Sequence, residues 1–231
     1  GIASLAGSIV LGVVAALALA HVAVNARTGS QARILAAVVG QVAKATDDAR
    51  LLNIVDGLCS AFGVTAPVVV VVRSDEPNTV TFARRGEQAT LIVTSAALDR
   101  LDRIELEALV AHELAHLRRG DVERAASIMS ALSFLALRST SIARWCARLG
   151  GVDRESFADL AATSITRYPP ALADTLELLD ASRGELVRAL PRDFVRLTGW
   201  QWCAPLFAPG EGAIAARGLS LQERAQVLRE L

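Results

Sequence analysis

The sequence is short of the residue types that mark several classes of protein. Its three cysteines, Cys59, Cys146 and Cys203, lie far apart and form no Cys-x-x-Cys pair. This argues against a disulfide framework and against a cysteine metal site. The formal net charge is zero, with no basic tail and no interleaving of basic and aromatic residues. Nucleic acid is therefore not expected as a partner. Because 52% of the 231 residues are apolar, the chain is expected to fold rather than to be disordered.

Charge is also missing from the first 26 residues, which contain no Asp, Glu, Lys or Arg. As a helix this segment is about 39 Å long, whereas the hydrocarbon core of a bilayer is about 30 Å thick. We therefore predict a transmembrane anchor over residues 1–26, with a signal peptide or a buried core helix as alternatives. Arg27 and Arg33 follow this segment. The positive-inside rule then places the rest of the chain on the cytoplasmic side of the cell membrane.

The rest of the chain predicts a helical linker over residues 27–45 and one α+β domain, mostly helical, over residues 46–231. Apolar residues at helical spacing predict its helices, and β-branched runs between turn residues predict its strands. Helices are expected at 47–62, 103–120, 125–137, 154–166, 170–181 and 219–231, and strands at 67–73, 79–84 and 90–94. No long helical crossover separates the strands, which favours a small antiparallel sheet.

Histidine is scarce as well, yet two of the three histidines, His112 and His116, stand four positions apart in the stretch HELAH. On a helix they share one face and can offer two imidazole nitrogens to one metal ion. Glu113 lies beside the first ligand and can take a proton from water activated by that ion. The pattern is the HExxH signature of zinc peptidases. A solvated His/Glu turn is the alternative.

A catalytic zinc ion needs a third protein ligand, and the chain offers no further histidine nearby. Glu155 and Asp159 share a face of a later predicted helix. Glu155 can complete a His-His-Glu set, and Asp159 can accept a hydrogen bond from the outer N–H of a ligand histidine. An exposed acidic helix face is the alternative. Asp121 is expected to cap the next helix, with a contact to a ligand as the second possibility.

Four stretches together resemble one family of integral-membrane zinc metallopeptidases. They are GVTAPVVVVVRSDEPNTVTF, TSAALDRLDRIELEALVAHELAHLRRGDV, ESFAD and TRYPPALADTLELL. The family includes the bacterial heat-shock protease HtpX and the CAAX prenyl protease of the endoplasmic reticulum. The resemblance covers about residues 51–181, with a weaker tail to residue 231.

The resemblance implies a zincin-like metallopeptidase domain over residues 46–231 that holds one Zn²⁺ per chain. It implies that His112, His116 and Glu155 bind the metal, that Glu113 is the general base and that Asp159 orients a ligand. It also implies a protein or peptide substrate, held along an edge strand of the sheet by β-augmentation.

Asn78 would lie near that edge strand, unless it is only a turn residue.

Two departures from the family pattern stand out. Between His116 and Glu155, where HtpX-type members usually carry two membrane spans, this chain offers only the short apolar run 125–137 and the helix-like stretch SIARWCARL. Near the C-terminus, GLSLQER keeps Arg224 but has Gly218 where the family has a histidine. The group that stabilises the oxyanion is therefore missing from its usual place. Arg224 or Tyr168 could replace it; a surface salt bridge and a packing role are the alternatives.

Three functions fit these observations. The first is a membrane-anchored zinc endopeptidase that acts in membrane protein quality control. The second is a sensor-transducer membrane peptidase of the type that cleaves an antirepressor; those proteins carry Cys where this chain has Ala158. The third is a non-catalytic membrane scaffold with a retained metal site, although a structural site has no need of Glu113.

Overall fold

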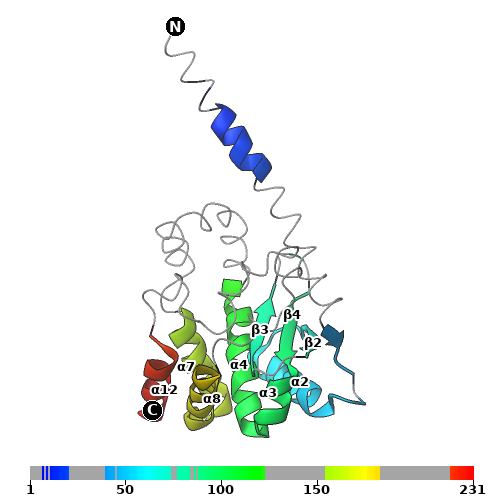
Figure 1. The fold of residues 1–231 in the computed structure, drawn as a ribbon, viewed down its shortest axis with the longest axis vertical. Helices are drawn as coiled ribbons and strands as arrows, with labels where there is room; N and C mark the ends of the chain where they lie inside the picture. Colours follow the sequence, from blue (N-terminus) through cyan, green and yellow to red (C-terminus); the bar gives the residue numbers. More distant parts are fainter. Residues whose placement is uncertain are drawn as a thin grey trace.

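The computed structural model describes the helices and strands that surround the candidate site. The described residues are 7, 9, 11–20, 40–44, 46–73, 77–83, 86, 88–122, 154–182 and 219–231. Helix α4 (Arg103–Arg119) lies between the sheet and the helices α7 (Arg154–Thr166), α8 (Pro169–Ala181) and α12 (Leu221–Arg229) (Figure 1). The fold is thus α+β and mostly helical, as the sequence predicts.

The sheet is mixed, which corrects the prediction of an antiparallel sheet. Its strand order is β1 (Gly40–Val42), β2 (Val68–Val72), β4 (Thr90–Thr94) and β3 (Thr79–Phe82). β1 and β3 pair antiparallel with their neighbours, but β2 and β4 run parallel. The chain needs no helix to return between them because β3 runs back and then pairs on the outer side of β4. β3 is therefore an edge strand of the described sheet.

Two predictions at the N-terminus have different outcomes. Within the predicted linker at residues 27–45, Gly40–Val42 is a strand, because the edge of β2 that β4 leaves free pairs with it. Residues 7, 9 and 11–20 of the predicted anchor are helical. Among the described residues, no helix has the length and apolarity required to cross a membrane. The remaining anchor residues and the predicted helix at 125–137 lie outside the described part.

Local signals in the sequence account for the ends of α4, the helix that carries HELAH. Asp102 accepts a hydrogen bond from the backbone N–H of Glu105, and Glu105 accepts one from that of Asp102, a capping box. Gly120 ends the helix with φ 66°, in the left-handed region that glycine adopts without strain. Its ten buried residues include Leu106 and Leu114, which pack in the main core between the sheet and the other helices.

The other helices join this core at their apolar faces. α2 (Ala49–Phe62) packs against α4, α3 (Ser95–Arg100) follows β4 directly, and α12 packs against α8. α7 lies along α4. Because α7 packs against α4, side chains of α7 can reach the face of α4 that carries the histidines.

Candidate metal centre

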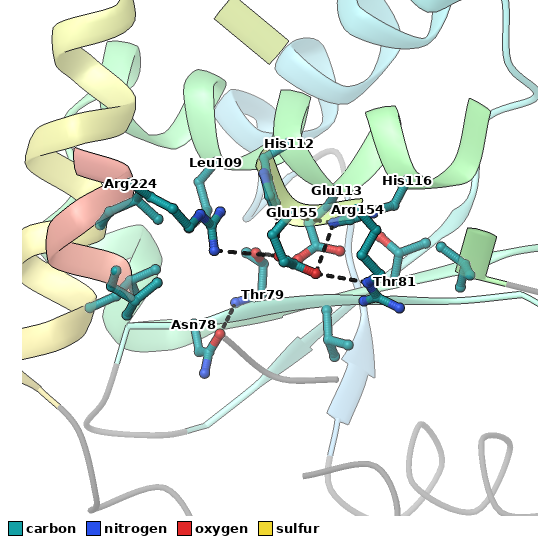
Figure 2. A pocket seen from close by; sticks show the side chains of 15 residues that line it. Asn78, Thr79, Thr81, Leu109, His112, Glu113, His116, Arg154, Glu155 and Arg224 are labelled. Atoms are coloured by element: carbon teal, nitrogen blue, oxygen red, sulfur yellow. Dashed lines mark hydrogen bonds and ion pairs between the residues drawn. The ribbon is translucent and has the colours of Figure 1, made fainter. Parts of the chain in front are cut away.

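His112 and His116 point from one face of α4 toward the same place. Their Nε2 atoms are 3.1 Å apart, and both side chains are almost fully buried. Glu155, in the first turn of α7, faces them: Oε2 lies 3.3 Å from His112 Nε2, and Oε1 lies 3.5 Å from His116 Nε2. Figure 2 shows the three side chains converging in the pocket. The structure thus brings together the three residues that the sequence nominates as metal ligands.

The spacing of these ligand atoms suits a zinc ion. Zinc binds imidazole nitrogen at about 2.0–2.1 Å in tetrahedral sites, so two of its ligand atoms lie about 3.3–3.4 Å apart. The observed separations of 3.1, 3.3 and 3.5 Å lie around this value. Three protein ligands also leave the fourth position of a tetrahedral ion free. The donor set therefore fits a metal of this class, and it is the one such group among the described residues.

A carboxylate lies behind each histidine. Asp159, one turn after Glu155 on α7, has Oδ1 2.9 Å from His112 Nδ1, a charge contact that is not aligned as a hydrogen bond. Asp121 has Oδ1 3.0 Å and Oδ2 3.2 Å from His116 Nδ1. The second possibility for Asp121 is thus present, because its carboxylate is buried against a ligand histidine. Its expected capping role stays a prediction, since the backbone N–H groups that it would cap lie outside the described residues. Such partners fix the orientation of a ligand ring.

Arg224 connects the C-terminal helix α12 to this site. Its Nε and Nη2 atoms donate to the two oxygens of Asp159 at 2.7 Å each, and Nη1 lies 3.4 Å from Glu155 Oε2. The side chain is only 2% exposed. Arg224 is thus a buried partner of the acidic residues of α7, and the alternative of a surface salt bridge does not hold.

Glu113 lies in the same pocket but outside the group of metal ligands. It is buried, and the Thr79 hydroxyl of β3 donates to its Oε1 at 3.3 Å. The sequence analysis did not single out Thr79. The alternation along β3 could have revealed it, because Thr79 and Thr81 share one face of a strand and both line the pocket.

Arg154 was also missed, although it directly precedes Glu155 in the sequence. Its Nε donates to Glu155 Oε1 at 2.8 Å, and its side chain lines the pocket (Figure 2). No motif in the sequence separates this arginine from an exposed residue at a helix start. Only the contact of α7 with α4 places it at the site.

Of the two remaining candidates for a substrate or oxyanion contact, one lines the pocket and the other does not. Asn78 lines the pocket at the start of β3, where its side-chain oxygen accepts from the Thr79 backbone N–H at 2.8 Å. Its own backbone N–H donates to Thr94 Oγ1 at 2.8 Å. Tyr168 precedes α8, is about half exposed and is not among the residues that line the pocket. The structure therefore does not bring Tyr168 to the other site residues.

The ligand residues form a tightly coupled cluster of charges. Burial by itself would lower the pKa of His116, but the charge of Glu155 and the hydrogen bond to Asp121 raise it to about 9. The pKa of His112 is also raised, because its contacts with Asp159 and Glu155 outweigh its burial. Burial would raise the pKa of Glu155, but the two histidines and Arg154 hold it well below its usual range. A metal ion must therefore compete with protons for these imidazoles.

Comparisons with known proteins agree with this geometry. Residues 45–176, which include all three metal-ligand candidates, match the model of Peptidase family M48. The chain is similar to a "Protease HtpX homolog" of Dictyoglomus thermophilum, with 30% identity over 171 residues, 60% of this chain and 56% of the relative. It is also similar to a "Protease HtpX homolog" of Acidiphilium cryptum, with 30% identity over 215 residues, 78% of this chain and 72% of the relative.

A third relative, the "Protease HtpX homolog" of Gemmatimonas aurantiaca, is 34% identical over 111 residues, 47% of this chain and 40% of the relative. The match to the Dictyoglomus protein spans little more than half of that relative's length. The family model, by contrast, covers more than half of this chain, including the HELAH helix and the helix of Glu155. The chain therefore belongs to Peptidase family M48.

Proposed function

We propose that this chain is a zinc-dependent endopeptidase. The observation that carries the proposal is the convergence of His112, His116 and Glu155 at the spacing of a tetrahedral zinc site, with Glu113 beside them. A site that only stabilised the fold would have no use for a second, non-ligating carboxylate in the same pocket. Membership of Peptidase family M48 supports the same reading.

Zinc in this site would polarise the substrate carbonyl and lower the pKa of water to about 7. Glu113 then acts as the general base: it takes a proton from the attacking water as the new C–O bond forms. It delivers that proton to the peptide nitrogen as the C–N bond breaks, so that the amine leaves neutral. The hydrogen bond from Thr79 to Oε1 holds the Glu113 carboxylate in place for both transfers.

The substrate is a peptide in extended conformation, held beside β3. This strand pairs with β4 on one side and forms the edge of the described sheet, and its residues Thr79 and Thr81 line the pocket. An edge strand offers backbone donors and acceptors to an added strand. Asn78 holds the start of β3 through its hydrogen bonds with Thr79 and Thr94. These contacts fix the position of that edge relative to the metal ligands.

Membrane attachment is part of the proposal. It is supported by the uncharged, apolar run of residues 1–26 and by Arg27 and Arg33 after it. An anchor of this kind holds the peptidase at the cytoplasmic face of the cell membrane. Misfolded or membrane-proximal proteins are then the substrates that the site meets most often, as quality control requires.

The test is the zinc content and the casein cleavage of the purified protein and of Glu113→Gln. We expect one zinc per chain in both proteins and a loss of cleavage of at least about 100-fold in the variant. Glu107→Gln is the matched control, because it makes the same change on the same helix at a residue that does not line the pocket. A parent protein without stoichiometric zinc, or a Glu113→Gln protein that cleaves casein normally, would refute the proposal.

A further inference from the structure

Two arginines line the pocket, and they use their donors differently. Arg224 directs Nε and Nη2 to Asp159 at 2.7 Å each and is 2% exposed. A guanidinium carries five N–H donors in a rigid plane, so a bidentate pair of this kind fixes its orientation. The remaining Nη1 faces Glu155 Oε2 at 3.4 Å. Arg224 is therefore committed to the acidic residues of α7 and has little left for a substrate.

Arg154 is not committed in this way. Its Nε donates to Glu155 Oε1 at 2.8 Å, and the structure records no acceptor for its two Nη atoms among the described residues. The side chain is 18% exposed, whereas that of Arg224 is 2% exposed. Figure 2 shows Arg154 beside Glu155 in the pocket. Within the part of the chain that the structure describes, donors of Arg154 thus remain available next to a metal ligand.

The surroundings keep this guanidinium charged and in place. Burial opposes the charge, but Glu155, Asp121 and Glu113 together raise the pKa of Arg154. Arg154 and Glu113 line the same pocket, so the cation faces the space in which the proposed base would act. Peptide hydrolysis builds negative charge on the carbonyl oxygen, and donors aimed at that oxygen stabilise it.

We propose that Arg154 is the residue that donates a hydrogen bond to the carbonyl oxygen of the scissile peptide as negative charge develops there. The inference rests on the proposed peptidase function and adds to it. It also replaces both earlier candidates for this role, since Arg224 is held by Asp159 and Tyr168 does not line the pocket. The bond from Nε to Glu155 aligns the guanidinium, and an Nη atom makes the contact.

The experiment compares the parent with Arg154→Gln, Arg154→Lys and the control Arg229→Gln. Arg229 is an exposed arginine of α12 that pairs with Asp174 and Glu177 and does not line the pocket. For each protein, zinc affinity is measured against a chelator, and affinity for a phosphinic peptide, which mimics the tetrahedral geometry, is measured by calorimetry on zinc-saturated protein. Steady-state cleavage of a fluorogenic peptide gives kcat and KM.

For Arg154→Gln we expect kcat and phosphinic peptide affinity each to fall about 100-fold, with KM and zinc affinity changed less than tenfold. Arg154→Lys should recover part of both losses, because it restores the charge without the planar fork. Arg229→Gln should match the parent.

Two results would overturn the inference. If zinc affinity falls about 10–100-fold while the zinc-saturated variant binds the phosphinic peptide normally, Arg154 only positions Glu155. If Arg154→Gln equals the parent in every measurement, Arg154 has no role in the reaction. In both cases an active, zinc-bound parent leaves the proposed function intact, whereas a parent that neither cleaves nor binds the phosphinic peptide refutes both proposals.

Discussion

At the scale of residues, both ligand histidines are held from behind by a carboxylate. Asp159 faces His112 and comes from the same helix as Glu155, so the sequence motif predicts it. Asp121 faces His116 and comes from the turn after α4. In the sequence it resembles a helix cap, because Asp is common at that position. The left-handed backbone of Gly120 is what turns the chain back and brings Asp121 to His116.

Asp121→Asn should therefore lower zinc affinity by about 10–100-fold, because an amide orients the ring but no longer strengthens its basicity. Zinc affinity by chelator competition is the measurement. Asp99→Asn, at an exposed residue of α3, is the matched control and should leave affinity unchanged. Equal affinity in Asp121→Asn and the parent would show that the contact with His116 does not tune the metal.

At the scale of elements, α4 and α7 carry the site residues, and the ends of these helices fix where those residues lie. The capping box of Asp102 and Glu105 begins α4, and Gly120 ends it. α2 ends in the same way at Gly63, with φ 65° compared with 66° at Gly120. At both glycines an added Cβ would have no atom within 4 Å. Any cost of Gly→Ala therefore comes from the backbone alone.

Gly63→Ala and Gly120→Ala should each lower the free energy of unfolding by about 1–2 kcal/mol, because alanine is strained in the left-handed region. Urea denaturation of the metal-free proteins measures this loss. Only Gly120→Ala should also weaken zinc binding, since it disturbs the turn that holds Asp121 against His116. Equal zinc affinities in the two variants would separate that turn from the metal site.

At the scale of the whole molecule, proton binding and metal binding are linked through His116. Its pKa is raised to about 9 from an ordinary value of about 6.5. Protonated His116 therefore stabilises the metal-free fold fully below pH about 6.5, and this stabilisation is lost as the pH rises through about 9. Zinc binds only the neutral imidazole, so the apparent affinity for zinc increases over the same pH range.

The rise in melting temperature caused by a fixed excess of zinc should accordingly grow between pH 6.5 and pH 9. Scanning calorimetry of the metal-free and zinc-loaded proteins, at matched ionic strength, checks this. A zinc effect that stays constant or shrinks across that range would contradict the raised pKa of His116.

The sequence by itself determined the parts of this protein that follow from local physics. Helical spacing predicts α4 and α7 closely, and β-branched runs predict β2 and β4. The i, i+4 rule places His112 with His116 on one face of one helix. These features depend only on neighbours along the chain, so the chain itself carries the information.

Only the tertiary structure decided how these elements meet. The parallel pairing of β2 with β4 depends on where β3 finds a free edge. Arg154 and Asp121 reach the ligands because α7 lies against α4 and because the chain turns at Gly120. Arg224 meets Asp159 across 65 positions of sequence. Contacts of this kind depend on packing between distant segments, whose partners no local pattern of residues specifies.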